Sequence, residues 1–179
     1  ALKGNPDCGG LISYNYISGE PVTGLAEGRP LFVRSAGDKF NLANFMRAHL
    51  HASVGVLKIG NDILFNEEKI KVDRITGHGG LFKTAGVGQR ILAAAINSPI
   101  SVMETAGEGG PWGMALLASY LVNNPKGLPL DEYLDRVVFA GNTGVEIAPT
   151  PEDVEGFNKY IENYKACLGI EEAAVNCKK

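Results

Sequence analysis

Several features of common protein classes are missing from this sequence of 179 residues. No apolar run approaches the ~18–20 residues that cross a bilayer, and the N-terminus lacks the apolar core of a signal peptide. The 17 basic and 20 acidic residues nearly balance, which argues against a cationic field over the whole protein for nucleic acid or anionic lipid. No spacing of Cys, His and carboxylates indicates zinc, and no G-x-S-x-G motif indicates an esterase.

Cysteine is also scarce. Cys8, Cys167 and Cys177 are odd in number and include no CxxC pair. The simplest interpretation is a reduced, cytoplasmic compartment, although the sequence leaves a Cys167–Cys177 bridge open. Since the chain has no starting Met, we expect it to be processed or truncated.

The composition that remains is that of an ordinary globular protein. Hydrophobic residues make up 45% and charged residues 21%, which excludes wholesale disorder. A chain of this length buries ~70% of its unfolded surface, so one compact domain is expected without disulfide or metal. We expect a disordered lead-in over 1–9, a domain over 10–167 and a loose tail over 168–179. The 23 glycines are numerous for the length and point to backbone-built turns.

Apolar periodicity predicts the first elements. Residues 11–17 and 31–33 are typical of short strands, separated by a loop with Gly and Pro. Apolar residues at three- and four-residue steps predict a helix over 39–64, for which Asp38 is the expected N-cap.

The central third repeats one pattern, in which a strand runs into a glycine turn and then a helix. Residues 70–75 precede Gly77–Gly80 and a helix over 87–96, and residues 100–103 precede Gly107–Gly110 and a helix over 112–122. This alternation predicts α/β architecture, a mixed sheet flanked by helices. Since ligands bind at the carboxyl ends of such strands, we expect a site formed by Gly77–Thr84 together with Ala106–Gly113.

The last third has a different character. Residues 131–138 fit a short helix that runs into a strand, and 143–147 fit a strand or an extended loop. Thr150 followed by Pro151 predicts the start of a helix that continues to about residue 167.

The first glycine turn nearly matches a phosphate-binding loop. Gly77 to Thr84 read G-H-G-G-L-F-K-T, but Phe82 stands where that loop requires glycine. The residues alone leave a ligand site and a tight packing turn equally open. In the second turn, Glu108 fits a helix cap at least as well as a catalytic group.

Other chemistry-bearing residues give weaker signals. His49 and His51 diverge on a helix and cannot easily share a metal, and His78 fits either a ligand contact or a turn-stabilising role. Arg47 is expected in a surface or interdomain salt bridge, and Trp112 in the core.

With both turns placed, the order of motifs resembles the C-terminal domain of the FGGY carbohydrate kinases, with the pentulose (xylulokinase-like) branch nearest. The resemblance rests on Tyr14–Glu20, on Arg47-Ala48-His49-Leu50, on Ile75–Gly80 with Gln89–Ala93, and on Glu108–Ala118, and it covers about residues 10–167. The chain departs from the family pattern in a longer first turn and in Ala94, where the family has Asp.

The resemblance implies a ribonuclease H-like, actin-like ATPase fold and transfer of the γ-phosphate of ATP to a sugar hydroxyl with Mg²⁺. It implies nucleotide contacts from Gly79, Gly80, Leu81, Thr84, Glu108 and Gly113. The family's catalytic Asp and most sugar contacts precede the matched region, so we expect no catalytic residue and no metal ligand in this chain. We therefore expect the nucleotide-binding half of a cytoplasmic kinase of a pentulose such as D-xylulose, inactive by itself.

The same resemblance implies partners. A kinase domain N-terminal to this one would cover part of its surface, so an exposed apolar face is expected here. Family members are often dimers, which makes a homodimer an expectation too. The alternative function is a non-catalytic sugar- or nucleotide-sensing or dimerisation domain derived from this fold.

Overall fold

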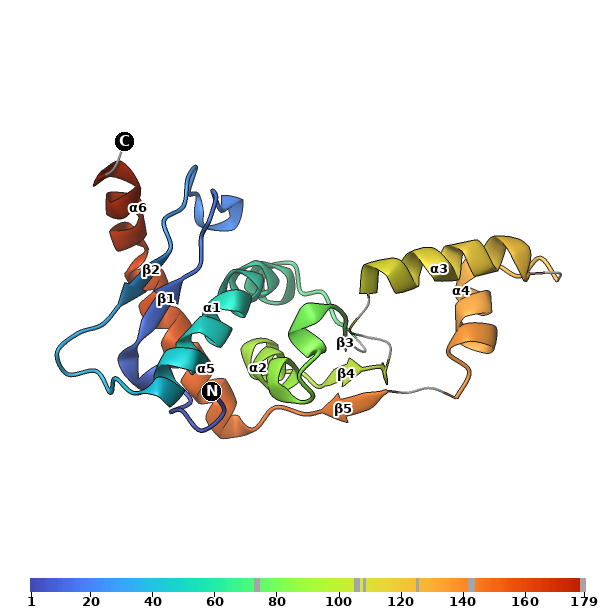
Figure 1. The fold of residues 1–179 in the computed structure, drawn as a ribbon, viewed down its shortest axis with the longest axis horizontal. Coiled ribbons are helices and arrows are strands. Elements are labelled where there is room, and N and C mark those ends of the chain that lie inside the picture. Colours follow the sequence, from blue (N-terminus) through green and yellow to red (C-terminus); the bar gives the residue numbers. More distant parts are fainter. Residues whose placement is uncertain (73–74, 105–106, 108, 125, 142–143, 178–179) are drawn as a thin grey trace.

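The computed structural model describes residues 1–72, 75–104, 107, 109–124, 126–141 and 144–177. Most of them form a body of helices around two small sheets, and an arm extends from it (Figure 1). The strands are β1 (Ile12–Tyr14), β2 (Leu31–Val33), β3 (Ile75–Gly77), β4 (Ile100–Val102) and β5 (Val145–Ile147). The helices are α1 (Leu42–Asp62), α2 (Val87–Ile96), α3 (Gly109–Val122), α4 (Leu130–Tyr133), α5 (Pro151–Ala166) and α6 (Leu168–Cys177).

The long predicted helix is α1, but it starts later than expected. Its N-cap is Asn41, whose side chain accepts a hydrogen bond from the Asn44 N–H, and not Asp38. The Asp38 carboxylate instead accepts from the Ser35 N–H and closes the preceding turn. The prediction was wrong because both residues are good caps, and the path of the loop decides between them.

The strands form a two-stranded and a three-stranded sheet. β1 and β2 are antiparallel, while β3 and β4 are parallel and β5 joins β4 in antiparallel orientation. The mixed sheet and its flanking helices confirm the predicted α/β class. The strand expected over 70–75 is found at Ile75–Gly77. The strand expected at the end of 131–138 is absent, since α4 continues there as a π-helical turn over Leu134–Val138.

The core lies where α1, α2 and α5 meet β1. Tyrosines from distant parts of the chain fill it: the Tyr14 hydroxyl donates to the Tyr164 carbonyl at 2.6 Å, and the Tyr164 hydroxyl donates to the Tyr16 hydroxyl at 2.6 Å. Each buried phenol thus has a partner, which removes the cost of burying its polar atom. α5 begins at Pro151 with Thr150 as its N-cap, as predicted.

The N-terminal segment packs against the body, although a disordered lead-in is expected from its sequence. Cys8 is fully buried, and the Asn5 N–H donates to the Asn44 side chain at 2.7 Å. Residues 168–177, expected as a loose tail, form α6, where Glu171 is buried and accepts from the Arg29 N–H. Cys8, Cys167 and Cys177 are all free, so the Cys167–Cys177 bridge does not form.

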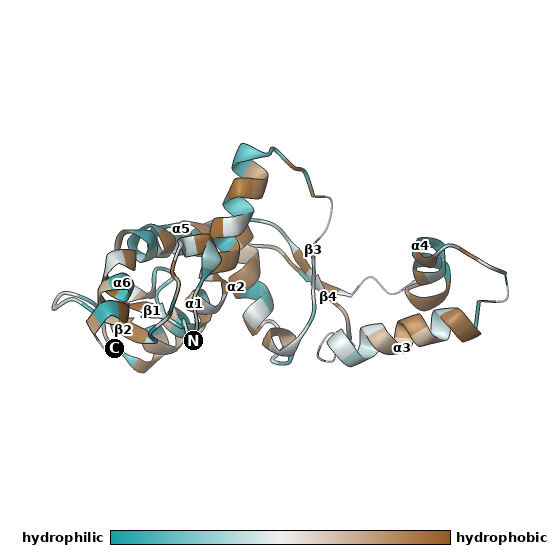
Figure 2. Cartoon of the chain, turned by 90° about the horizontal axis from the view of Figure 1, so that it is seen from above, coloured by the Kyte–Doolittle hydropathy of each residue, from teal (hydrophilic) through white to brown (hydrophobic). Residues whose placement is uncertain are grey.

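The arm consists of α3 and α4 and stands away from the body in both views (Figures 1 and 2). None of the described residues of α3 is buried. The prediction that Trp112 lies in the core was therefore wrong. Residues 109–124 carry no charge, and the exposed apolar side chains of α3 are those of Met114, Leu117, Leu121 and Val122. α3 is thus an exposed apolar face of the kind that was expected.

Within the described residues, no helix is long and apolar enough to cross a membrane.

Candidate functional site

The two glycine turns begin at the same edge of the three-stranded sheet. β3 and β4 are parallel, with Ile75 opposite Ile100 and Gly77 opposite Val102. Their carboxyl ends therefore lie side by side, and each leads into one of the turns. This is the place where open α/β sheets bind ligands, because the chain reverses there and leaves a crevice.

Glycine is favoured at two positions of the first turn. A Cβ on Gly77 would lie 2.4 Å from the Phe82 ring, and Gly79 has a φ of +105°, which side chains rarely allow. The Phe82 ring thus folds back over Gly77. This arrangement explains why a phenylalanine stands at the position that a phosphate-binding loop keeps for glycine. The turn has its own geometry and is not that loop.

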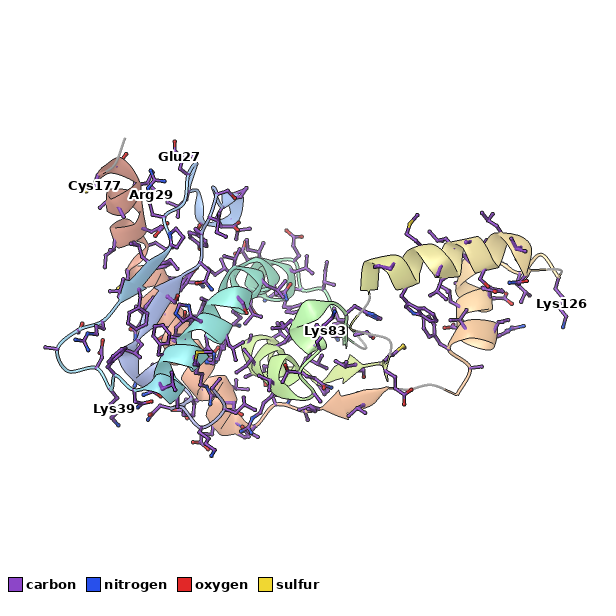
Figure 3. The ribbon with its side chains drawn as sticks, viewed as in Figure 1. Glu27, Arg29, Lys39, Lys83, Lys126 and Cys177 are labelled. Carbon is purple, nitrogen blue, oxygen red and sulfur yellow. The ribbon has the colours of Figure 1, made fainter. Side chains whose placement is uncertain are left out.

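The two turns meet, as the sequence predicts. A Cβ built on Gly109, at the start of α3, would lie 3.4 Å from the Cβ of His78 and 3.6 Å from the Gly79 nitrogen. A Cβ on Gly107 would lie 3.3 Å from the side chain of Lys83. Figure 3 shows Lys83 on the body, beside the point where the arm departs. The arm therefore begins at the candidate site.

The residues predicted to contact a nucleotide have different surroundings. Gly79, Gly80 and Gly113 face open space, since a Cβ on any of them would have no neighbour within 4 Å. Thr84 is exposed. Leu81 is half-buried and packs against the core, which leaves only its main chain for a ligand. Glu108 lies outside the described residues.

A cavity of about 530 Å³ opens beside Thr84, between the start of α2 and the strands β4 and β5. This volume is in the usual range for small-molecule sites. Its lining is largely apolar and comprises Phe82, Lys83, Thr84, Ala85, Gly86, Gln89, Val102, Met103, Glu104, Val145 and Ile147.

Sequence reasoning gave Gln89 no role in this site. Its side chain lies at the cavity, is only 4% exposed, and donates hydrogen bonds to the carbonyl oxygens of Ile100 and Val145. The available signal was an amide on the buried face of an otherwise apolar helix. A buried polar group needs partners, and these partners come from strands that no local pattern could place.

Two other polar clusters are structural. Ser13 Oγ lies 2.9 Å from His49 Nδ1 and 3.0 Å from Asn15 Oδ1, but Ser13 is fully buried and unavailable to a substrate. Arg47, expected in a surface or interdomain salt bridge, does form a salt bridge with Asp153, but it is 1% exposed and the pair is buried. In the part of the chain that the structure describes, no three His, Cys, Asp or Glu side chains could hold a metal ion together.

Comparisons with known proteins agree with this geometry. Residues 1–122 match the FGGY family of carbohydrate kinases, C-terminal domain. Among solved structures, the fold is similar to a ligand-bound xylulose kinase from Lactobacillus acidophilus, with a TM-score of 0.70, 20% identity and coverage of 96% of this chain and 34% of that one. It is also similar to a gluconate kinase from the same organism, with a TM-score of 0.69, 21% identity and coverage of 96% and 34%.

A more distant likeness is to a Plasmodium falciparum glycerol kinase solved with ADP, with a TM-score of 0.61, 18% identity and coverage of 92% of this chain and 31% of that one. The chain thus spans about a third of the length of these structures. A search of curated protein sequences found no match. At these identities the solved structures show the shared fold, whereas the family match covers most of the chain. The chain therefore belongs to the FGGY family of carbohydrate kinases, in which it corresponds to the C-terminal domain.

Proposed function

We propose that this chain forms the nucleotide-binding wall of an ATP-dependent carbohydrate kinase. The observation that carries the proposal is the meeting of two glycine turns at the carboxyl ends of β3 and β4. Open backbone at Gly79 and Gly80 lets a nucleotide approach the main chain more closely than side chains would allow. The fold to which this site belongs is, in our proposal, the ribonuclease H-like, actin-like ATPase fold.

Each predicted contact takes a role that fits its surroundings. Gly79, Gly80 and the main chain of Leu81 would lie against the nucleoside, and the exposed Thr84 hydroxyl would supply a hydrogen bond. Gly113 in α3 would face the nucleotide from the start of the arm. Glu108 is retained as a proposed contact from the sequence alone.

The remaining chemistry is assigned to the rest of the kinase. Mg²⁺ neutralises charge on the transferring phosphoryl group, and the described residues offer no carboxylate cluster for it. The metal would therefore be held by the phosphates and by an N-terminal kinase domain, which would also bring the sugar and its base. Proper positioning of reactants is worth ~7–11 kcal/mol, so we expect no kinase activity from this chain by itself.

The substrate and context are further parts of the proposal. We propose a pentulose such as D-xylulose, supported by the likeness to a xylulose kinase, while the gluconate and glycerol kinases mark the wider range of the family. We keep residues 10–167 as the domain, a cytoplasmic location, and a homodimer as proposals from the resemblance.

Calorimetric titration with ATP and ADP tests the nucleotide site. Weak saturable binding around 1 mM, or about −4 kcal/mol, is expected for the unmodified chain. Gly80→Arg should abolish it, because Gly80 is exposed in open space without a positive φ, so that arginine fits the fold and fills the site. Gly169→Arg, in equally open space on α6, is the matched control and should bind normally. Equal binding by all three proteins would show that the nucleotide lies elsewhere.

A dimerisation domain is the second candidate function, favoured by the uncharged and exposed α3. Sedimentation over a range of concentrations separates the two. A stable dimer with no nucleotide binding would favour this alternative over the kinase.

A further inference from the structure

Gln89 is the one glutamine of the sequence, and it occupies the first turn of α2. Apart from Gly88 and Gln89, the buried residues of this helix are apolar: Ile91, Leu92, Ala93, Ala94, Ala95 and Ile96. Burying an amide costs free energy unless it is fully hydrogen-bonded. Its bonds therefore indicate what the residue does.

Both bonds reach main-chain carbonyls of the sheet. The Gln89 Nε2 atom donates to the carbonyl oxygen of Ile100 at 2.6 Å and to that of Val145 at 2.6 Å. These are the first residues of β4 and β5, which are separated in the chain by the whole arm. One amide group thus joins the strand that leads into the arm to the strand that returns from it.

β5 is a short strand whose contacts with β4 include the Ser101 hydroxyl, which donates to the Glu146 carboxylate at 3.3 Å. It pairs with β4 over three residues, is an edge strand among the strands that the structure describes, and leaves Val145 67% exposed. Such a short edge strand buries too little apolar surface to be fixed by packing. The bond from Gln89 adds a direct link from α2 to the first residue of β5, whose own exposed side chain contributes little packing.

The position of β5 sets the shape of the cavity beside Thr84. Val145 and Ile147 line one side of it, and Thr84 and Gly86 line the other. The two sides approach closely, since a Cβ on Gly86 would lie 3.6 Å from Ile147 Cδ1. Gln89 spans this gap from α2 to β5, so its side chain fixes the separation.

We infer that Gln89 is a positioning residue for the candidate nucleotide site. Its amide holds β5 and the returning end of the arm against α2, and it thereby sets the cavity next to Thr84. The inference rests on the proposed function, because it assigns to Gln89 the arrangement of that same site. Gln89 acts through β5.

The test uses Gln89→Leu and Gln89→Glu in this chain. Leucine removes both donors, and a glutamate carboxylate would face two carbonyl oxygens without a proton to offer. Once protonated, the glutamic acid has one O–H to donate, so lowering the pH should restore part of the contact. Lys83 and Glu104 are charged residues that line the same cavity. Because they are unchanged in all the proteins compared, they do not account for a difference between the variants. Asn158→Asp, an exposed amide-to-acid change on α5, is the matched control.

Hydrogen exchange gives a readout that does not depend on nucleotide. At pH 8, both variants should lower the protection factors of residues 145–147 about tenfold, the effect of leaving a buried carbonyl without its donor. Relative to the unmodified chain at the same pH, this protection should recover in Gln89→Glu at pH 5, and the protection of helix α5 should not differ between the variants and the unmodified chain. If Gln89→Leu fails to fold, Gln89→Glu at pH 5 and pH 8 still provides the comparison within one protein.

ATP titration of the same proteins completes the test. Both variants should bind ATP about tenfold more weakly than the unmodified chain at pH 8, and Gln89→Glu should regain affinity at pH 5. Unchanged protection of β5 overturns the inference, as does unchanged ATP affinity where the unmodified chain binds. Absence of ATP binding by the unmodified chain overturns the proposed function, and the role of Gln89 in nucleotide binding with it.

Discussion

Arg47 in α1 and Asp153 at the start of α5 lie 106 residues apart in the sequence, yet the Arg47 Nη2 atom donates to Asp153 Oδ1 at 2.6 Å in the protein interior. Arg90 of α2 and the Thr150 hydroxyl donate to the other carboxylate oxygen at 2.7 and 2.9 Å. Asp153 therefore ties three helices together. Burial alone would raise the pKa of Asp153, but the hydrogen bonds from these partners outweigh it and hold the pKa below its usual value.

Replacing one member of this pair should be costly. Asp153→Asn leaves the buried guanidinium of Arg47 without its counter-charge, and we expect the free energy of unfolding to fall by about 3–5 kcal/mol. Urea denaturation measures this change.

The double replacement Arg47→Met with Asp153→Leu removes both charges and should cost less than Asp153→Asn. Lys58→Ala, which opens the partly exposed Lys58–Asp62 pair in α1, should cost at most about 1 kcal/mol. A double variant at least as unstable as Asp153→Asn would contradict a direct interaction between the two charges.

His51 makes the fold sensitive to mild acid. Burial and the nearby Arg47 lower the pKa of His51 to about 3, and its Nε2 atom lies 3.0 Å from the Pro6 carbonyl. The folded state thus keeps the ring neutral, whereas the unfolded chain takes up a proton near pH 6.5. Stability is present above pH 6.5 and falls as the pH drops below it, by about 2 kcal/mol at pH 5.

Urea denaturation between pH 7.5 and pH 5 measures this loss, with His51→Gln as the variant that cannot titrate. Asp7 and Asp153 have lowered pKa values, so their contributions are lost only at lower pH. Glu171, whose pKa is raised by burial, acts in the opposite direction but is common to both proteins. Parallel stability curves for the two proteins would exclude His51 as the source of the acid sensitivity.

Gly156 sets how closely the N-terminal segment approaches α5. A Cβ there would lie 2.2 Å from the Pro6 Cβ and 2.9 Å from the Asp7 nitrogen. Gly156→Ala should therefore lower the thermal midpoint and speed proteolysis within residues 1–10, at a cost of about 1–3 kcal/mol. Gly169→Ala on α6 meets no neighbour and should be neutral or stabilising, since alanine favours helix over glycine. A stable Gly156→Ala protein would mean that the N-terminal segment is not packed there.

The apolar surface of α3 should make the isolated chain associate. Leu121 is 82% exposed on a helix without charge, and large exposed apolar patches drive association. Leu117→Lys combined with Leu121→Lys should lower both the concentration-dependent mass in sedimentation and the binding of a fluorescent apolar dye. Ile17→Lys, an equally exposed but isolated site on the body, serves as control. Association that survives the double change would place the contact outside α3.

Local sequence patterns were sufficient for most elements of the body. The helix predicted over 87–96 is α2 residue for residue, because its Ala-rich segment and the following Ser98-Pro99 are local signals. The juxtaposition of the two glycine turns was also predictable, since parallel neighbours end at the same edge of a sheet.

The failures share one physical cause. Arg47 was expected in a surface or interdomain salt bridge and Trp112 in the core, because charge and hydrophobicity usually sort residues that way. Whether a charge is buried depends on a partner such as Asp153, and whether an apolar helix is buried depends on what lies against it. Neither fact is contained in the neighbouring residues.

The sequence by itself determined the class of fold, the family, and the two glycine turns, because periodicity, caps and glycine positions act within a few residues of each other. Only the tertiary structure decided that Asp153 joins α1, α2 and α5, and that Gln89 holds β5 beside the cavity. Contacts between residues distant in the chain depend on how whole elements pack. A buried polar side chain then has to find its partner among whatever groups that packing brings within reach.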